Sequence, residues 1–314
     1  MSTRRGFTLV EVLVVVAIIG ILAALITVAV SGAMRATQRA SIGWQMAQVV
    51  MALEHYKAEF GEYPPDMFDD GALVSHVRKR WPRMNYPDGY WTDAWTNERR
   101  ANWIRDAITG AYPHVAGNEA ADFTDPNFSQ VGALALWLGG FPNSDGRLSG
   151  FYAAPGNPFT PSDTFDRKVF LDLELGKSVR IQTFGEVSVP VIGNEVRGAF
   201  VPFVYFRGRT SGGDTAYKYA VNNNGGNEWV VKQFEFSEFG LCVPYAEDVV
   251  GHVDAIVNWK NPTTYQLIHP GLDGRFGSTE DNVRVINTGE GISLQDLDNL
   301  TNFSDYKELR SILP

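Results

Sequence analysis

The stretch RRGFTLVEVLVVVAIIGILAALITVAV, residues 4–30, is apolar along almost its whole length. From Phe7 to Val30 it predicts a helix about 36 Å long, which is enough to cross a bilayer core of about 30 Å. We therefore expect residues 7–30 to form a transmembrane helix. A secretory signal peptide with a small-residue cleavage site ending at Ala33 is the alternative, although its apolar region should be only about 7–15 residues long and free of acids.

One carboxylate, Glu11, lies near the start of this apolar stretch. Placing an unpaired carboxylate in hydrocarbon costs a few kcal/mol, so such a residue points to a function. The structural alternative is a side chain that extends from the helix end to the lipid head groups. The chemistry of this residue alone leaves both interpretations open.

The composition of the 314-residue chain bounds its class. It is 44% hydrophobic and 12% aromatic, which is typical of a folded protein. A net charge of -9 and the lack of a dense Lys/Arg patch argue against nucleic acid as a partner. The single cysteine, Cys242, excludes an intrachain disulfide, and we expect it to be a buried apolar residue.

The helical pattern continues beyond the apolar stretch, through residues 31–61. Gly61 and the Pro64-Pro65 pair predict where this helix ends. A helix of about 50 residues fits a membrane or coiled-coil role better than an ordinary globule. The predicted buried stripe recurs at steps of three and four residues and consists of Ile42, Met46, Val49, Leu53, Tyr56 and Phe60.

The string RRGFTLVE, residues 4–11, resembles the processing site of type IV prepilins and of type II secretion pseudopilins. In these families a membrane peptidase cuts after the Gly of a short basic leader, and the new N-terminal Phe is methylated. The resemblance implies a leader at residues 1–6, cleavage between Gly6 and Phe7, and a methylated Phe7 amine. The string MALEHYKAEFGEYPPD also resembles the end of the long helix in major, or G-type, pseudopilins.

The resemblance gives Glu11 a role. In a filament of parallel helices, Glu11 of one subunit approaches the Phe7 amine of its neighbour, and the pair fixes the axial register. The resemblance also implies a homo-oligomeric helical filament. Its implied partners are the prepilin peptidase, the inner-membrane secretion platform and minor pseudopilins. Equal numbers of Arg flank the apolar stretch, so the resemblance alone places the N-terminus in the cytoplasm and the head in the periplasm.

Residues 62–314 predict a globular α+β head with an antiparallel β-sheet packed on the long helix. Residues 67–197 exceed the length of ordinary major pseudopilins, and we interpret them as a helical and irregular insertion of unassigned role. Helices are predicted near Asp70–Lys79, Asn97–Ala107 and Gln130–Leu138. Strands are predicted near residues 167–173, 178–184, 199–206, 215–221 and 264–270.

The string HPGLDGRFGSTEDN, residues 269–282, combines three acids with three glycines. Calcium binds carboxylate and backbone oxygens in irregular geometry, and such a loop offers both. Composition alone is equally compatible with a solvated acidic turn. The segment resembles the calcium loop of major pseudopilins, which implies Asp273 and Asp281 as side-chain ligands. Glu280 and the backbone near Leu272 are the further candidates. His269, just before the loop, is expected to be a structural neighbour, since calcium prefers oxygen.

No local sequence motif of a common catalytic site occurs in the chain, so a structural role is predicted rather than an enzyme. Two alternatives remain: a minor or adhesive type IV pilin, and a membrane-anchored or secreted carbohydrate-binding protein or enzyme. The tryptophans of the insertion support the second, although a small separate core explains them as well. They are Trp81, Trp91, Trp95 and Trp103.

Overall fold

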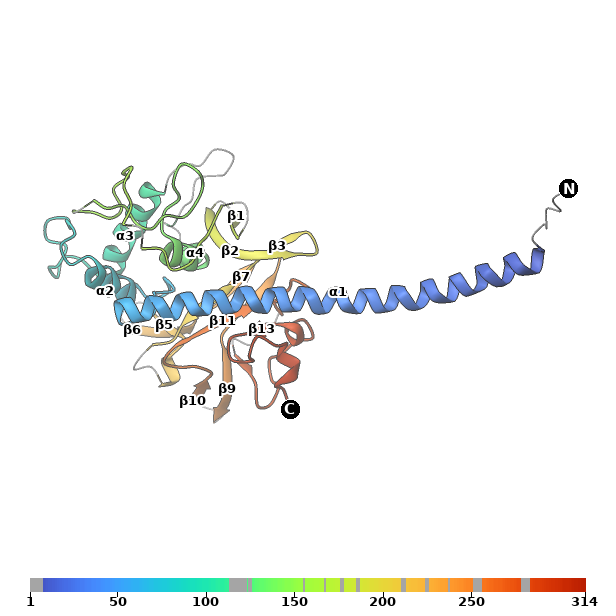
Figure 1. Cartoon of the computed structure of the whole chain (residues 1–314). Coiled ribbons are helices and arrows are strands. Elements are labelled where there is room, and N and C mark those ends of the chain that lie inside the picture. The colour runs from blue at the N-terminus through green and yellow to red at the C-terminus, as the bar shows by residue number, and fades with distance from the viewer. Residues whose placement is uncertain are drawn as a thin grey trace. The chain divides into compact units, whose positions relative to one another are not determined.

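The structure is a computed structural model of the whole chain. The chain divides into two compact units, residues 1–42 and 43–314. A single helix, α1 (Leu9–Phe60), crosses the boundary between them (Figure 1). The described residues are 8–112, 123, 126–154, 156–166, 168–175, 178–184, 187–209, 213–223, 226–236, 238–250, 256–277 and 283–314.

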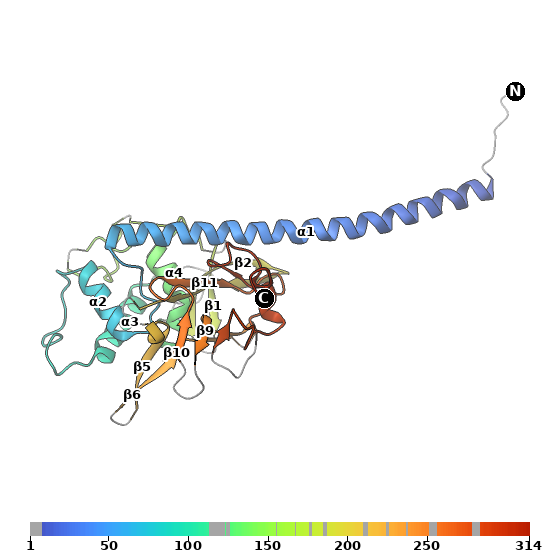
Figure 2. The ribbon, with the colours of Figure 1, turned by 90° about the horizontal axis from the view of Figure 1, so that it is seen from below.

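The 52 residues of α1 confirm the predicted continuous helix. In the first unit its large apolar side chains are exposed, from Leu9 to Met34. In the second unit α1 is amphipathic and lies along one side of the head strands (Figure 2). Its buried stripe there follows the predicted spacing, with Met46, Val49, Leu53 and Tyr56 all buried, while Phe60 at the end of the stripe is half-buried.

Gly61 ends α1, as predicted. Its φ of 77° lies in the left-handed region, and its N–H donates to the Lys57 carbonyl at 2.7 Å. A residue with a Cβ is strained in this conformation, so glycine is the favoured residue after the last turn. The chain then passes through Pro64 and Pro65, which cannot continue a helix, and both are buried.

In the described part of the head, three further α-helices confirm the three predicted from sequence. Asp69 caps α2 by accepting the Ala72 N–H, and Thr96 caps α3 by accepting the Arg99 N–H. In α4 every residue from Gln130 onward is buried, so this helix is part of the core. The helices are α2 (Asp70–Arg80), α3 (Asn97–Ala111) and α4 (Pro126–Gly139).

The described strands form three three-stranded sheets and two hairpins. The first sheet is β1 (Val179–Phe184), β2 (Val187–Val196) and β3 (Ala199–Pro202). The second is β13 (Leu300–Thr301), β11 (Tyr265–His269) and β4 (Val204–Arg207). The third is β10 (Ile256–Trp259), β9 (Tyr245–Val250) and β12 (Arg284–Val285). The hairpins are β5 (Lys218–Asn223) with β6 (Gly226–Val231), and β7 (Phe234–Phe236) with β8 (Gly240–Cys242).

The α+β fold is thus confirmed, with a long N-terminal helix and antiparallel sheets in the head. The strands are shared among several small sheets, and β12 pairs with β9 in parallel. Helix α4 packs on β2, the central strand of the first sheet. A Cβ on Gly132 would lie 3.3 Å from the Pro190 carbonyl and 2.8 Å from Phe123, so the glycine permits this close approach.

Two strand predictions need correction. Residues 167–173 form no strand where they are described; instead the N–H groups of Phe170 and Leu171 both donate to the Leu138 carbonyl at the end of α4. The strand predicted at 215–221 begins only at Lys218. The remaining predicted strands correspond to β1, to β3 with β4, and to β11. Cys242 is buried and unpaired, as expected.

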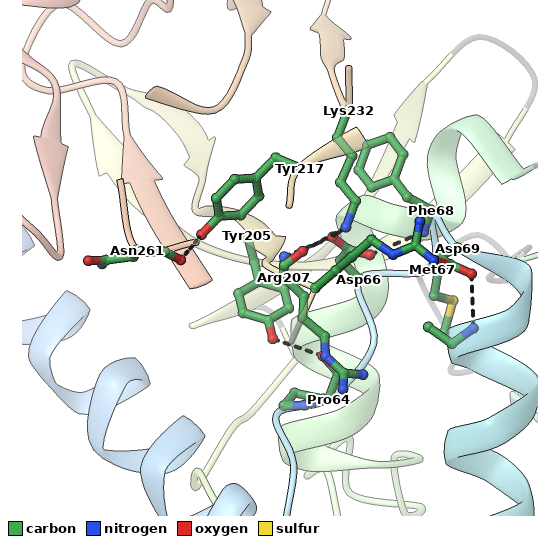
Figure 3. A network of polar contacts seen from close by, with 12 residues as sticks. Pro64, Asp66, Met67, Phe68, Asp69, Tyr205, Arg207, Tyr217, Lys232 and Asn261 are labelled. Atoms are coloured by element: carbon green, nitrogen blue, oxygen red, sulfur yellow. Dashed lines mark hydrogen bonds and ion pairs between the residues drawn. The ribbon is translucent and has the colours of Figure 1, made fainter. Parts of the chain in front are cut away.

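A buried polar network joins the segment after α1 to the strands (Figure 3). Asp66 Oδ2 accepts from Lys232 Nζ at 2.6 Å and from the Arg207 N–H at 2.8 Å. Lys232 Nζ also donates to the Arg207 carbonyl at 2.7 Å, and the Tyr205 hydroxyl donates to the Pro64 carbonyl at 2.8 Å. Because a buried charge is tolerated only when it is paired and hydrogen-bonded, this network fixes the path of residues 64–69 against β4.

The described residues of the head also form three helical turns of 3₁₀ type. They are η1 (Gly213–Thr215), η2 (Gln295–Asp298) and η3 (Leu309–Ser311). The predicted insertion, residues 67–197, contains α2 to α4 together with β1 and β2. It does not separate from the rest of the head, because residues 43–314 form one compact unit.

Candidate functional site

The first turn of α1 holds a reciprocal pair of side-chain hydrogen bonds. The Thr8 N–H and the Thr8 hydroxyl both donate to Glu11 Oε2 at 2.8 Å, and the Glu11 N–H donates to Thr8 Oγ1 at 3.3 Å. This is a capping box, in which each side chain satisfies an amide that the helix leaves open. Glu11 therefore caps its own helix. The T-x-x-E spacing signals this role, which was not predicted.

The apolar part of α1 meets the physical requirements of a membrane span. Its most apolar 18-residue window has a mean hydropathy of 3.1, and none of that window is buried. The hydroxyl of Thr27 donates to the carbonyl of Ala23 at 2.8 Å, so this polar group needs no partner outside the helix. Among the described residues α1 is the one helix long and apolar enough to cross a membrane, which fits a single-pass anchor.

The N-terminal sequence, including the first part of α1, matches a known family model. Residues 1–27 match the model described as "Prokaryotic N-terminal methylation motif". This part of the chain is a prepilin-type methylation motif. The motif includes Gly6, Phe7 and Glu11. Gly6 and Phe7 lie outside the described residues, so cleavage, methylation and subunit pairing at these positions stay predictions.

Three similar proteins are each named "Type II secretion system core protein G". The protein from Klebsiella pneumoniae is 34% identical over 89 residues, which are 28% of this chain and 64% of that protein. Those from Pectobacterium carotovorum subsp. carotovorum and Dickeya chrysanthemi are 34% and 33% identical over 88 residues, covering 56% and 58% of their lengths. The chain thus spans less than two thirds of each relative. No solved structure matches the chain.

The second candidate site is the loop that begins after β11. A tight turn at residues 271–274 is held by Asp298 at the end of η2. Asp298 Oδ2 accepts the N–H groups of Leu272 at 2.9 Å and of Asp273 at 3.1 Å. Gly271 has a φ of 74°, and a Cβ there would lie 2.2 Å from the Asp298 carbonyl oxygen. The turn can therefore approach η2 only with glycine at this position.

The far end of the same loop is anchored by a buried ion pair. Asp296 Oδ1 accepts the Gly277 N–H at 3.1 Å and lies 3.1 Å from Arg284 Nη1. Arg284 Nη2 donates to the Gly277 carbonyl at 3.1 Å, and neither Arg284 nor Asp296 is exposed. The residues on both sides of 278–282 are therefore tied to η2 and its neighbours.

The structure brings one predicted metal ligand next to a carboxylate that was not predicted. Burial raises the pKa of Asp273, and the neighbouring Asp298 raises it further, while Arg197 and Arg275 act in the opposite direction. Burial also raises the pKa of Asp298. Asp298 is 25 residues from Asp273 in the sequence, so no local motif could have shown the pair.

Two nearby, partly buried carboxylates fit a hard cation, because its charge would offset the cost of burying theirs. Glu280 and Asp281, the other acids predicted as ligands, lie outside the described residues. Within the described part of the chain, no group of three or more His, Cys, Asp or Glu side chains is placed to hold a metal ion. Asp273 and Asp298 would therefore need oxygen ligands from elsewhere, such as the backbone at Leu272.

His269 is placed as a structural neighbour of this loop. Its Nδ1 accepts the Gly271 N–H at 3.1 Å, so its other ring nitrogen carries the proton and donates to Asn194 Oδ1 at 2.8 Å. Burial lowers the pKa of His269 to about 3, which keeps the ring neutral. Both ring nitrogens are engaged, so His269 supports the turn and offers no lone pair to a metal.

Proposed function

We propose that this chain is a structural subunit of a type II secretion pseudopilus. The proposal rests on one observation above all: a prepilin-type methylation motif leads directly into a capped helix without charged residues from Val12 to Met34. The relatives named as core protein G support the same role. The chain is inserted in the inner membrane by α1, with its head in the periplasm.

The proposed mechanism is mechanical and uses α1 as the assembly element. The prepilin peptidase cuts after Gly6 and the Phe7 amine is methylated. Subunits then join side by side through the apolar part of α1. Addition of subunits at the membrane platform moves the filament, and the cargo in front of it, outward. Minor pseudopilins and the inner-membrane platform are the partners of this cycle.

Glu11 has the chemistry for two roles in this assembly. Its Oε2 accepts both hydrogen bonds from Thr8, whereas no described residue donates to Oε1. One carboxylate oxygen thus caps the helix and the other faces the surroundings, since the residue is exposed. In the filament Oε1 pairs with the Phe7 amine of the neighbouring subunit. In a medium of low dielectric, each charge offsets the desolvation of the other.

The N-terminal peptide tests this function directly. Mass spectrometry of the chain purified from cell membranes should show a start at Phe7 with a methylated amine. A start at Met34 would mean that the apolar stretch is a cleaved signal peptide, and the filament role would be wrong. A chain that retains residues 1–6 in cells with an active prepilin peptidase would contradict the processing step as well.

We further propose that calcium binds the loop between β11 and β12. The side chains of Asp273 and Asp298, the backbone near Leu272, and the acids Glu280 and Asp281 would supply its oxygen ligands. Bound calcium would join the turn at 271–274 to η2 and so stabilise the head. The melting temperature of the full chain in detergent should fall with EDTA and recover with calcium but not with magnesium. An unchanged melting curve in EDTA would exclude a stabilising calcium site.

A further inference from the structure

The segment between α2 and α3 gathers aromatic rings at the surface of the head. Tyr90 lies at the centre, with ring centroids 4.8 Å from Trp91, 5.0 Å from Trp95 and 5.3 Å from Trp103. Trp81 is not part of this group, because it packs on the core residues Phe151 and Phe159 in another part of the head. The four tryptophans of the insertion therefore divide into one half-buried residue that packs on the core, Trp81, and three that surround Tyr90.

Arg100, on α3, is hydrogen-bonded to the backbone of this aromatic segment. Its Nε donates to the Tyr90 carbonyl at 2.7 Å and its Nη2 donates to the Thr92 carbonyl at 2.9 Å. The Tyr90 hydroxyl in turn donates to the Arg100 carbonyl at 3.0 Å. These bonds fix the backbone that carries Trp91 and Trp95. The rings are thus preorganised, which lowers the entropic cost of binding a ligand.

Only part of this aromatic group serves as a core. Tyr90 is 1% exposed, but Trp91 is 41% exposed, and Trp95 and Trp103 are only half-buried. A satellite core explains Tyr90. It does not explain why indole rings remain at the surface next to polar side chains, and such patches mark binding sites in many proteins.

A shallow hollow of about 450 Å³ opens beside Trp95 and Trp103 on the face of α3. Its volume is in the range of small-molecule sites. The guanidinium of Arg99 lies 4.2 Å from the centroid of the Trp95 ring and covers one face of it. The polar side chains of the hollow are Glu98, Arg99, Asn102 and Asp106, with Thr96 at the helix start.

The polar groups of the hollow include both acceptors and donors. No described residue forms a hydrogen bond or an ion pair with the carboxylate of Glu98 or of Asp106, and the guanidinium of Arg99 makes only its contact with the Trp95 ring within the described part of the chain. Two carboxylates at the rim disfavour an anionic ligand. The hollow is also open rather than enclosed, so it suits one segment of a long ligand and not a fully buried small molecule.

We propose that this hollow binds a neutral oligosaccharide. The C–H faces of the sugar rings would contact the indole rings of Trp95 and Trp103, and the hydroxyl groups would hydrogen-bond to Glu98, Asn102 and Asp106. This binding goes beyond the pseudopilus role and is independent of it, because it uses only α3 and the segment before it. Through this hollow the head would bind glycan polymers.

Calorimetric titration of the full chain with cellohexaose and with maltohexaose tests the proposal. The chain is kept in lauryldimethylamine oxide, because detergents with sugar head groups would compete for the site. Saturable binding of at least one of the two hexasaccharides is expected. Absence of binding for both at millimolar concentration would overturn the proposal. Its failure would leave the pseudopilus role intact, since that role is tested by the N-terminal peptide.

Two variants and a matched control locate the binding. Trp95→Ala and Asp106→Asn should each weaken binding by about tenfold or more. Trp229→Ala is the control, because Trp229 is a 43% exposed tryptophan on β6 that also contacts an arginine, Arg209, at 4.9 Å. It should leave the affinity unchanged. Unchanged affinity in Trp95→Ala, with an unchanged circular dichroism spectrum, would contradict the assignment, and so would an equal loss in Trp229→Ala.

Discussion

Lys232 Nζ lies 2.6 Å from Asp66 Oδ2, and both side chains are almost wholly buried, at 2% and 3% exposed. Burial lowers the pKa of Lys232, because the ammonium group loses its hydration, while Asp66 acts in the opposite direction. The pair joins the segment that follows α1 to the segment between β6 and β7 (Figure 3). A long-range ion pair thus helps to fix the path of the chain just after the long helix ends.

Lys232→Met should destabilise the head strongly. The variant leaves the carboxylate of Asp66 buried without its cation, and breaking a buried pair from one side costs about 3–5 kcal/mol. Chemical denaturation of the full chain in detergent, followed by circular dichroism, measures this change in the free energy of unfolding. The double variant Asp66→Asn with Lys232→Met should recover part of the loss, because it removes the uncompensated charge.

Lys168→Met is the matched control for this prediction. Lys168 pairs with Glu59, but the two side chains are 52% and 48% exposed, so solvent screens the pair. Its loss should cost about 1 kcal/mol or less. Equal effects of the two Lys→Met changes would show that burial does not decide the strength of the Asp66–Lys232 pair.

The buried ring of His76 should make the head less stable in mild acid. The ring is 1% exposed; its Nδ1–H donates to Glu62 Oε1 at 3.0 Å, and its Nε2 accepts from the Tyr56 hydroxyl at 2.6 Å. Burial lowers the pKa of His76 to about 4, from 6.5 in the unfolded chain. The folded state therefore favours the neutral ring. This contribution is complete above pH 6.5 and is lost as the pH falls towards 4.

The melting temperature should accordingly decrease between pH 6.5 and pH 4. Glu62 extends the loss to lower pH: burial alone would raise its pKa, but hydrogen bonds from His76 and Lys79 outweigh burial and lower the pKa to about 2. His76→Gln should flatten the profile between pH 6.5 and 4 at the cost of lower stability at pH 7. His55→Gln, at an exposed position on α1, should keep the wild-type profile. A steep profile in His76→Gln would assign the acid step to another group.

Asp298→Asn should reduce the response to calcium. The amide retains an oxygen that can accept the Leu272 and Asp273 N–H groups, so the turn keeps its shape while one negative charge is lost. We expect the gain in melting temperature with calcium to shrink to less than half. Asp172→Asn, which changes a carboxylate that is 73% exposed, is the control. An undiminished gain in Asp298→Asn would place the calcium elsewhere.

The long helix could be predicted because its signals are local. The apolar stretch, the three-and-four spacing of the buried stripe and the stop at Gly61 all depend on neighbours in the sequence. The run at 167–173 shows the limit of such reasoning. Its apolar residues pack as a loop over the core. The ring centroids of Phe170 and Tyr56, for example, are 4.9 Å apart. Apolar character alone therefore does not distinguish a strand from a packed loop.

The parts that could not be predicted depend on residues far apart in the chain. Asp66 and Lys232 are separated by 166 positions, and nothing near either residue announces the other. The same holds for Asp298, which supports the turn at Leu272 and Asp273 from 26 and 25 positions away. The capping box is a different case: Thr8 and Glu11 are three positions apart, so the T-x-x-E spacing is a local signal for it.

The two roles of Glu11 can be separated by two substitutions. Glu11→Gln keeps an oxygen that can accept from Thr8, and so preserves the capping box, but it removes the charge that the Phe7 amine of a neighbour requires. Thr8→Ala does the opposite: it removes the hydroxyl of the cap, at a cost of about 1 kcal/mol for the helix start, and leaves the carboxylate ionised.

Recovery of untagged subunits with tagged ones from membranes measures the assembly of each variant. If the charge sets the register, the amount of untagged subunit recovered should fall at least tenfold in Glu11→Gln and in Glu11→Ala. Thr8→Ala should assemble nearly as well as the wild type. If only the cap matters, the ranking reverses, with Thr8→Ala defective and Glu11→Gln near normal. Normal assembly in both Glu11 variants would exclude pairing between Glu11 and the neighbouring amine.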